Sequence, residues 1–438
     1  MKKLVLLVAV LVPQLCQAKD VTVGSVDEVK KAIKYSEPGD NVILKDGKWT
    51  DVDIAFVAQG EKGKPITIAP ETPGGVTFSG KSRLRIGGQH LVISGFRFHN
   101  IRKVSDSLQL RRDSRQPAFD CRVTDCVFDT DEDFVAGDSE SRWIGIYGKR
   151  NEIDHCCFEG KKSRGTTFVV WLTKADSGGH KIHHNLFGQR SKLGKNGGET
   201  LRIGDSETSL REAKCLVEHN VFQRCNGELE CVSNKSCENI YRENLFHKVE
   251  GTLSLRHGNR CTIEGNQFFG DDLKHTGGIR IIGEDHLIKD NYLANLGGIT
   301  GRGAIVLQNG IADSPLNGYG PVRRAQVLNN IVVDCRESLV MGYADKDAKK
   351  AKVVPADCVF RGNQFYAPDD RVVVLEHHAA RDTQWKSNFA LGKSLGMDET
   401  DGIRFMARKD FLEVTPTRPK FDFAKECGAS WDSRRFEP

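Results

Sequence analysis

The segment CLVEHNVFQR, residues 215–224, contains a pattern that recurs along most of the chain. An aliphatic residue is followed, after two variable positions, by asparagine, and an aromatic or aliphatic anchor stands two positions further on. The pattern returns in ENIYRENLFHK, CTIEGNQFFG and HLIKDNYLAN, at residues 238–248, 261–270 and 286–295. The successive anchors, at steps of 24, 22 and 25 residues, are Phe222, Phe246, Phe268 and Leu293.

Short alternating strands repeated with this period are typical of a solenoid, in which each unit is too small to bury its apolar face alone and stacks on its neighbours. Asparagine tolerates the left-handed backbone that a sharp corner requires, and its amide can bond to the coils above and below. Other copies are 29 to 39 residues apart, which indicates loops inserted into single turns. We therefore predict an all-β fold, a single-stranded parallel β-helix.

The two ends of the chain depart from the repeat. Residues 25–40, SVDEVKKAIKYSEPGD, have Ser25 and Glu28 at the spacing of a capping box, followed by an apolar stripe. We expect a short amphipathic helix that covers the open end of the coil stack. After about Asp369 the repeat fades, so residues 370–438 should form the last coils and an irregular tail.

The first 18 residues, MKKLVLLVAVLVPQLCQA, resemble a secretory signal: two lysines precede an apolar run that is short for a membrane span. We predict a signal peptide at 1–18, a single soluble domain at 19–438, a secreted or periplasmic protein, and no membrane partner. Twelve cysteines remain after cleavage, and export makes disulfides possible. Most of these cysteines lie within apolar strand patterns, which favours buried thiols.

Charge narrows the choice of partner. The formal net charge is only +5, which does not indicate a nucleic-acid-binding protein. A mildly basic surface can still attract an acidic polymer.

Four segments are predicted to occupy the same strand of successive coils: ETLRIGDS (199–206), ELECVS (228–233), GTLSLRHG (251–258) and GGIRIIGED (277–285). Strand alternation then assigns one set of side chains to the interior. These are Leu201, Ile203, Leu229, Cys231, Leu253, Leu255, Ile279 and Ile281. The outward set is Thr200, Arg202, Glu228, Glu230, Thr252, Ser254, Arg256, Gly278 and Arg280. Lys235 is expected just beyond its strand, in the following turn.

The outward set gathers carboxylates and arginines on one face. Ordinary solvated charges are one explanation. Two carboxylates near an amide oxygen are also a ligand set that suits Ca²⁺. An acid pair for glycoside hydrolysis is a rival use, but the crowded cations disfavour the raised carboxyl pKa that a general acid needs.

Several of these blocks, in order, resemble polysaccharide lyase family 6, the group of alginate lyases and chondroitinase B. The most specific are NGGETLRIGDS, GELECVSNKSCENIYRENLF, GTLSLRHGN and GGIRIIGEDH. The resemblance covers most of the chain and implies a right-handed parallel β-helix.

The resemblance also implies roles for individual residues. It makes Asn196, Glu228 and Glu230 the Ca²⁺ ligands, with Glu199 as a neighbour of similar ligand chemistry. It makes Lys235 the catalytic base and Arg256 the catalytic acid. His257 and Arg280 would contact substrate, and we add Arg202 and Tyr319 as candidate substrate-binding residues.

The implied reaction is β-elimination on a uronate-containing acidic polysaccharide, with Ca²⁺ as cofactor and the protein acting as a monomer. Alginate is the first candidate substrate and dermatan sulfate the alternative. A polygalacturonase-type hydrolase would need clustered aspartates on the outer face. A non-catalytic β-helical carbohydrate-binding protein would not need the Lys, Arg and Glu set.

Three other groups of residues have chemistry that could serve a site. His183 and His184 have metal-ligand chemistry but stand in a repeat corner, which favours a structural role. Arg111, Arg112 and Arg115 form a basic loop that is either solvated or borders the groove. The insertion that begins at Thr300 is longer than its coil requires. It could line one end of a substrate-binding groove on the outer face, through Gln308, Tyr319, Arg323 and Arg324.

Overall fold

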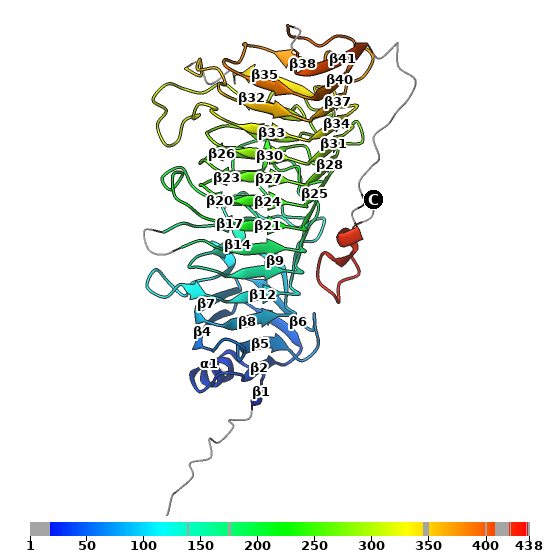
Figure 1. Ribbon diagram of the computed structural model, residues 1–438. Coiled ribbons are helices and arrows are strands. Elements are labelled where there is room, and N and C mark those ends of the chain that lie inside the picture. Colours follow the sequence, from blue (N-terminus) through cyan, green and yellow to red (C-terminus); the bar gives the residue numbers. More distant parts are fainter. Residues whose placement is uncertain are drawn as a thin grey trace, which may run out of the picture.

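The computed structural model describes residues 18–137, 140–173, 177–344, 350–398, 401–407, 420, 422–434 and 436. The chain winds into a stack of coils whose strands form three long parallel sheets (Figure 1). The prediction of an all-β, right-handed parallel β-helix is confirmed. Each coil contributes one strand to each sheet along most of the stack, so sequence neighbours lie on different sheets.

Each sheet joins strands from successive coils. The first sheet consists of β1 (Asp20–Val23), β2 (Asn41–Leu44), β5 (Ile66–Pro70), β8 (Leu91–Ser94), β12 (Arg122–Thr124), β15 (Glu152–Asp154), β18 (Lys181–His183), β21 (Leu216–Glu218), β24 (Ile240–Arg242), β27 (Thr262–Glu264), β30 (Leu287–Lys289), β33 (Gln326–Leu328), β36 (Val359–Arg361) and β39 (Gln384–Lys386). The second sheet consists of β4 (Asp53–Gln59), β7 (Arg83–Gln89), β10 (Asp106–Gln109), β11 (Ala118–Phe119), β14 (Arg142–Ile146), β17 (Phe168–Val170), β20 (Leu201–Gly204), β23 (Glu230–Lys235), β26 (Thr252–His257), β29 (Ile279–Ile281), β32 (Ile305–Gln308), β35 (Leu339–Tyr343) and β38 (Val374–Glu376). The third sheet consists of β3 (Gly47–Thr50), β6 (Val76–Gly80), β9 (Arg97–Ile101), β13 (Val127–Asp129), β16 (Cys157–Glu159), β19 (Leu186–Phe187), β22 (Val221–Gln223), β25 (Leu245–His247), β28 (Gln267–Phe269), β31 (Tyr292–Ala294), β34 (Ile331–Val333), β37 (Gln364–Tyr366), β40 (Asn388–Gly392) and β41 (Ile403–Ala407).

The anchors of the repeat fill the interior as a column of stacked rings. Phe222 and Phe246 have ring centroids 4.7 Å apart, and Phe246 and Phe268 are 4.5 Å apart, with nearly parallel planes. The column continues through Phe98, Phe128, Phe158 and Phe187. Each of these rings is almost fully buried, so the column supplies much of the apolar stabilisation that one coil could not provide alone.

A ladder of buried asparagines runs along one corner of the stack. The backbone N–H and the Nδ2 group of Asn220 both donate to Oδ1 of Asn244 at 3.0 Å, and Asn244 donates in the same way to Asn266. The full ladder is Asn185, Asn220, Asn244, Asn266, Asn291, Asn330, Asn363 and Asn388. The predicted coil-to-coil bonding of these amides is therefore confirmed.

The expectation that these asparagines adopt the left-handed conformation is wrong. The residue before each one does so, as at His184 (φ 53°), His219 (φ 51°) and Glu243 (φ 52°). The asparagine must direct its amide into the interior to reach the next rung, so the chain reverses one position earlier.

The N-terminal end of the stack is closed as predicted. Helix α1 (Val26–Lys34) begins after Ser25, whose Oγ accepts from the N–H of Glu28 at 3.3 Å. Val29 and Ile33 face the first coils and are buried. The predicted signal peptide at 1–18 lies outside the described residues, except for Ala18.

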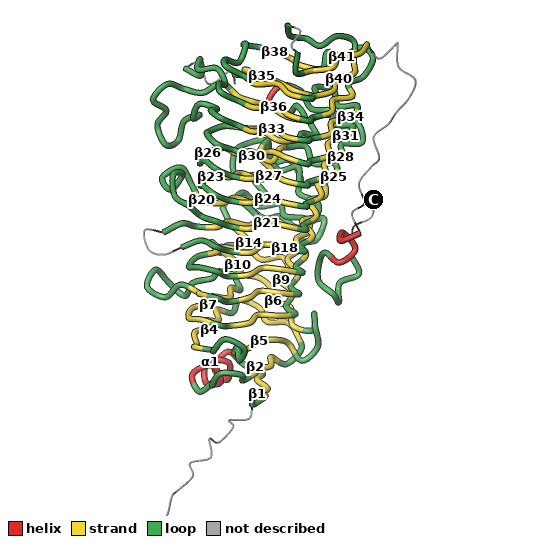
Figure 2. Tube along the Cα trace, in the orientation of Figure 1, coloured by secondary structure: helices red, strands yellow, loops and turns green. Residues whose placement is uncertain are grey.

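Coils continue beyond residue 370, through β38 and β40 to β41. A C-terminal segment, residues 422–434 together with Phe436, then lies along the outer side of the third sheet (Figure 2). It contains η3 (Asp422–Glu426) and packs Cys427 and Phe436 against an apolar strip that includes Val127, Leu186 and Val221. Trp431 Nε1 donates to the carbonyl of Asp125 at 2.8 Å.

The twelve cysteines of the described chain are free thiols and are buried, in agreement with the favoured prediction. Burial raises the pKa of Cys215 and Cys261 to about 12, so these thiols are inert core groups. Among the described helices, none combines the length and the apolar character that crossing a membrane requires.

Replacement of Asn244 by alanine tests the ladder. The substitution removes Oδ1, which accepts from the backbone N–H and the Nδ2 group of Asn220. It also removes Nδ2, which donates to the carbonyl oxygens of Val217 and Arg242 inside the stack. We expect the free energy of unfolding to fall by about 3 kcal/mol, because buried polar groups lose their partners. Denaturant unfolding followed by circular dichroism measures the change.

Asn41→Ala is the matched control, since Asn41 makes an exposed side-chain bond to Asp20 at 2.7 Å. Its effect should stay within about 0.5 kcal/mol, as is usual for surface substitutions. Equal losses in the two variants would contradict a special role for the ladder.

Candidate functional site

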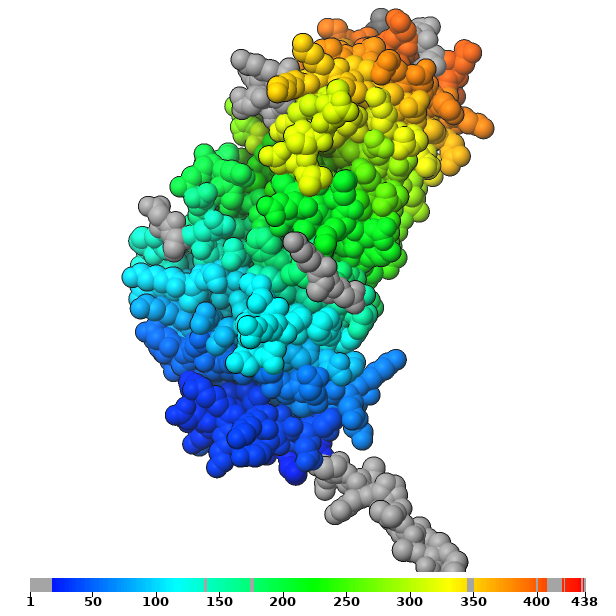
Figure 3. Space-filling view, turned by 90° about the vertical axis from the view of Figure 1, so that its left-hand side faces the viewer, coloured from blue at the N-terminus to red at the C-terminus, as the bar shows by residue number. Residues whose placement is uncertain are grey.

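A cavity of about 580 Å³ opens on the outer face of the second sheet, over β23, β26 and β29. Figure 3 looks onto this side of the molecule, where the yellow-green segment after residue 300 stands beside the green coils. Eight of the nine predicted site residues line the cavity. They are Asn196, Glu228, Glu230, Lys235, Arg256, His257, Arg280 and Tyr319.

The strand under this cavity differs from the predicted one. β23 begins at Glu230 and ends at Lys235, so Glu228 and Leu229 precede it and Lys235 belongs to it. Its pairing with β26 shifts in register between Glu230 and Val232 and again between Asn234 and Lys235. Simple alternation therefore fails here: Val232 takes the interior position beside Leu201, Cys231 stays buried at the first shift, and Leu229 is half-buried at the cavity wall.

Glu228 is held by the loop that carries Asn196. Its Oε2 accepts from the N–H groups of Gly197 and Gly198 at 3.0 and 3.2 Å. A Cβ at Gly227 would lie 2.1 Å from the carbonyl oxygen of Gly198, so this close approach requires glycine. Burial, and after it the negative charge of Glu199, raises the pKa of Glu228 to about 7, so the expectation that neighbouring cations disfavour a raised carboxyl pKa is wrong at Glu228. A cation at this point would relieve the clustering of acids.

Lys235 projects from the end of β23 into the cavity, with its side chain 18% exposed. Its Nζ lies 4.0 Å from Oε1 of Glu199, which is itself 2% exposed and accepts from Thr166 Oγ1 at 3.3 Å. A carboxylate and an amine thus face each other at the inner wall of the site.

Arg256 lies at the second register shift, where Lys235 pairs with His257. Its Nε is 3.5 Å from Oε1 of Glu230, and its guanidinium carbon lies 4.1 Å from the ring centre of Tyr319. Burial, then the charges of Arg256 and Lys235, lowers the pKa of His257 to about 3. His257 is therefore a neutral imidazole at ordinary pH.

Arg280 is a buried cation, 1% exposed, at the floor of the cavity. Its Nε donates to Oε1 of Gln308 at 2.7 Å, and its Nη1 lies 3.7 Å from Oε1 of Glu230. Two cations therefore face the one carboxylate of Glu230, whose Oε2 also accepts from Ser233.

Some predicted residues lie elsewhere. Arg202 is on the outer face of β20, but it is not among the residues that line the cavity; its guanidinium carbon lies 4.9 Å from the ring centre of Trp171. Of the insertion residues, Tyr319 lines the cavity, and Gln308 does not line it but accepts a hydrogen bond from Arg280, which does. Arg324 pairs with Glu284 and Asp285, and Arg323 donates to the carbonyl of Val354. Arg111, in the basic loop, stacks on Tyr147 at 3.6 Å.

Sequence reasoning missed several residues that line the cavity, and the charged ones among them are Lys192, Lys195, Glu250 and Arg302. Lys192 and Glu250 form an ion pair over 58 positions of sequence, which strand alternation cannot detect. Arg302 ends η1 (Thr300–Arg302) inside the long insertion, and burial lowers its pKa. The only sequence signal for Arg302 was the excess length of that insertion.

The donor set around Glu228 fits a hard cation. Two carboxylates and the amide oxygen of Asn196 are the ligand types that Ca²⁺ prefers, and the raised pKa of Glu228 reflects its burial and the nearby carboxylate of Glu199. Asn196 is exposed on its loop, with its Oδ1 accepting from Gly197 N–H at 3.0 Å.

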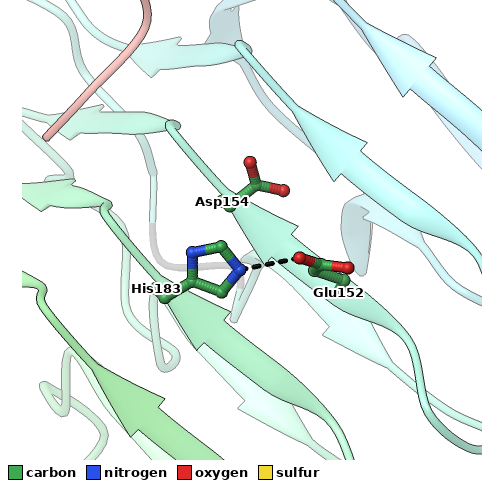
Figure 4. A group of neighbouring side chains, drawn as sticks. All are labelled: Glu152, Asp154 and His183. Atoms are coloured by element: carbon green, nitrogen blue, oxygen red, sulfur yellow. Dashed lines mark hydrogen bonds and ion pairs between the residues drawn. The ribbon is translucent and has the colours of Figure 1, made fainter. Parts of the chain in front are cut away.

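A second group that could hold a metal ion lies on the first sheet: Glu152, Asp154 and His183, with potential ligand atoms within 4.8 Å of one another (Figure 4). Glu152 Oε1 and His183 Nε2 are 2.8 Å apart. Burial by itself would raise the pKa of Asp154, but hydrogen bonds from Arg122 and His155 hold this pKa well below its usual value. Arg122 already neutralises this carboxylate, so the group is bonded as an ion-pair network.

Comparisons with known proteins agree with this geometry. The family model for chondroitinase B matches residues 23–418. No curated protein matches the chain. The structure of AlyGC, an alginate lyase of polysaccharide lyase family 6, superimposes with a TM-score of 0.86 at 34% identity and covers 96% of this chain. This chain spans 59% of the length of AlyGC.

A mannuronic acid-specific family 6 lyase from the human gut microbiota superimposes with a TM-score of 0.79 at 28% identity, covering 94% of this chain and 97% of its own. A family 6 polysaccharide lyase from Pseudopedobacter saltans shares the fold, with a TM-score of 0.74 at 22% identity and coverage of 94% and 99%. The chain belongs to the chondroitinase B family, polysaccharide lyase family 6.

Proposed function

We propose that this protein is an exported, Ca²⁺-dependent lyase that cleaves a uronate-containing polysaccharide by β-elimination. The observation that carries the proposal is the cavity in which Lys235 and Arg256 stand beside the carboxylates Glu228 and Glu230. Membership of the family supports the reaction class. A single chain supplies all of these residues, which supports action as a monomer.

The chemistry requires a base, an acid and a positive charge. Lys235, uncharged, would take the proton from C5 of the uronate as general base. The C5–H electron pair forms the C4=C5 double bond, the C4–O bond breaks, and Arg256 donates to the leaving oxygen. When bound, Ca²⁺ held by Asn196, Glu228 and Glu230 would stabilise negative charge on the substrate carboxylate.

The neighbouring side chains orient the substrate. Arg280 is a fixed cation at the floor of the cavity and can bind a carboxylate. His257, neutral because of its lowered pKa, can donate or accept a hydrogen bond without adding charge. The elimination leaves an unsaturated sugar at the new non-reducing end.

Alginate is the substrate that the neighbours favour, since AlyGC is named as an alginate lyase and the gut enzyme as mannuronic acid-specific. Dermatan sulfate is the second candidate, supported by the chondroitinase B family model. Export rests on the lysines and the apolar run of the first 18 residues.

Incubation with alginate, dermatan sulfate and pectin tests the reaction and the substrate. We expect the ultraviolet absorbance of an unsaturated product to rise with alginate, to stop after chelation, and to return with Ca²⁺, because the metal balances charge at the reacting carboxylate. Absence of product from all three polymers would refute the lyase proposal.

Lys235→Ala tests the base. We expect the turnover rate to fall by at least about 100-fold, the usual contribution of a general base, without loss of the fold. Lys214→Ala is the control, because Lys214 is exposed and pairs with Glu212 and Glu238 outside the cavity. Wild-type turnover in Lys235→Ala would remove this residue from the mechanism.

The raised pKa of Glu228 predicts the pH dependence of metal binding. Ca²⁺ must displace a proton from Glu228 below about pH 7. We expect the affinity for Ca²⁺, measured by calorimetry, to weaken by up to about tenfold for each pH unit below that value.

The stability of the metal-free protein should depend on pH through the same carboxyl group. The folded pKa of Glu228 lies above its ordinary value of 4.5, so its stabilising contribution is present below that pH and is lost as pH rises toward 7. Glu228→Gln should flatten this dependence of the melting temperature and abolish the pH-dependent part of Ca²⁺ binding. An unchanged profile in the variant would show that another group titrates.

A further inference from the structure

The loop at residues 309–321 contacts the proposed acid directly. Nη1 of Arg256 donates to the carbonyl oxygen of Gly318 at 2.9 Å, and Nη2 is 3.4 Å from the carbonyl oxygen of Asn317. The next residue, Tyr319, places its ring 4.1 Å from the guanidinium carbon. These three positions lie more than 60 residues from Arg256 in the sequence.

Backbone hydrogen bonds within the loop and to the neighbouring chain fix the conformation of the loop. Gly310 forms a two-way backbone bridge with Val353, and Ile311 N–H donates to the carbonyl of Tyr319 at 2.8 Å. Gly318 N–H donates to the carbonyl of Pro315 at 2.7 Å, which makes a tight turn just before the site. The tip, residues 312–317, is exposed, apart from half-buried Ser314.

Arg256 has a competing partner. Glu230 lies 3.5 Å from its Nε, and an arginine beside a carboxylate tends to form two parallel hydrogen bonds. The loop carbonyls accept hydrogen bonds from Nη1 and Nη2 instead. A two-bond pair with Glu230 would need one of these atoms in addition to Nε. The guanidinium is thereby turned toward the loop and the face of Tyr319, with Nη1 also 3.3 Å from Nδ1 of His257 and Nε directed at Glu230.

We infer that the loop at residues 309–321 is a positioning element, which orients Arg256 through the carbonyls of Gly318 and Asn317 and through the ring of Tyr319. This inference rests on the proposed function. The loop residues act through Arg256, so their loss should reduce the rate of the chemical step more than the binding of substrate.

Gly318→Ala tests the inference, with Gly320→Ala as its matched control. A Cβ at Gly318 would lie 2.4 Å from Ser314 Oγ, 3.0 Å from Pro315 Cδ and 3.2 Å from the carbonyl oxygen of Pro315, so it crowds the turn that places the carbonyls of Asn317 and Gly318. A Cβ at Gly320 would meet one atom, Gly283 Cα, at 3.8 Å. Both variants alter the same loop by one methyl group.

Steady-state kinetics on the polymer that the wild type cleaves give the readout. We expect kcat of Gly318→Ala to fall about tenfold or more with KM within about twofold, since a small misplacement of a catalytic group is costly. Gly320→Ala should keep both constants within about twofold of the wild type, the margin expected of an unstrained surface substitution. A kcat for Gly318→Ala equal to that of the wild type, an effect confined to KM, or an equal loss in Gly320→Ala would overturn the inference.

Tyr319→Leu is the second variant, in case Gly318→Ala does not fold. It removes the ring while keeping an apolar side chain, and we expect kcat to fall while the melting temperature stays near that of the wild type. Unchanged kcat in Tyr319→Leu would also count against the inference. No product from the wild type on any polymer would instead refute the proposed function, so the two failures are distinguishable.

Discussion

The asparagine ladder is the constraint on which the rest of the structure depends. Each amide fixes the next coil at one rung's distance, because Oδ1 of one asparagine accepts from the backbone and side chain of the previous one. Along the coils that carry the ladder, from Asn185 to Asn388, neighbouring parallel strands are then about 4.8 Å apart. Residues from separate coils, such as Lys235, Arg256 and Arg280, are held on one face at a repeatable spacing.

The cavity occurs where this regularity is interrupted. Pairing between β23 and β26 shifts twice, and pairing between β32 and β35 shifts once, between Leu307 and Gln308. These shifts lie beside Glu230, Lys235, Arg256 and Gln308, which all take part in the site or bond to it. The regular ladder therefore makes the stack rigid, and the local register shifts set the directions of the side chains that form the site.

The sequence was sufficient for the fold because the repeat is physically redundant. The same asparagine and anchor pattern appears many times, so errors at single coils did not affect the result. Most of the site was also predictable, since charged residues on adjacent strands of one face must be neighbours. Leu229 was misplaced because a register shift has no alternation signal, and the corner conformation was assigned one residue too late. Loop residues such as Lys192, Glu250 and Arg302 could not be placed, because their contacts depend on loop paths that no periodicity encodes.

The C-terminal segment has a consequence for the order in which the molecule is assembled. Each coil contacts its sequence neighbours, so the stack can grow in the order in which the chain is synthesised. Among the described residues, the apolar strip around Val127, Leu186 and Val221 is covered by a segment that is synthesised after the coils it contacts, and Trp431 bonds to Asp125 across 306 positions. Contacts along the stack are thus local in sequence, whereas docking of this segment joins parts of the chain that are synthesised far apart. A chain truncated before Cys427 would leave this apolar strip exposed to solvent, and an exposed apolar patch of this kind promotes aggregation.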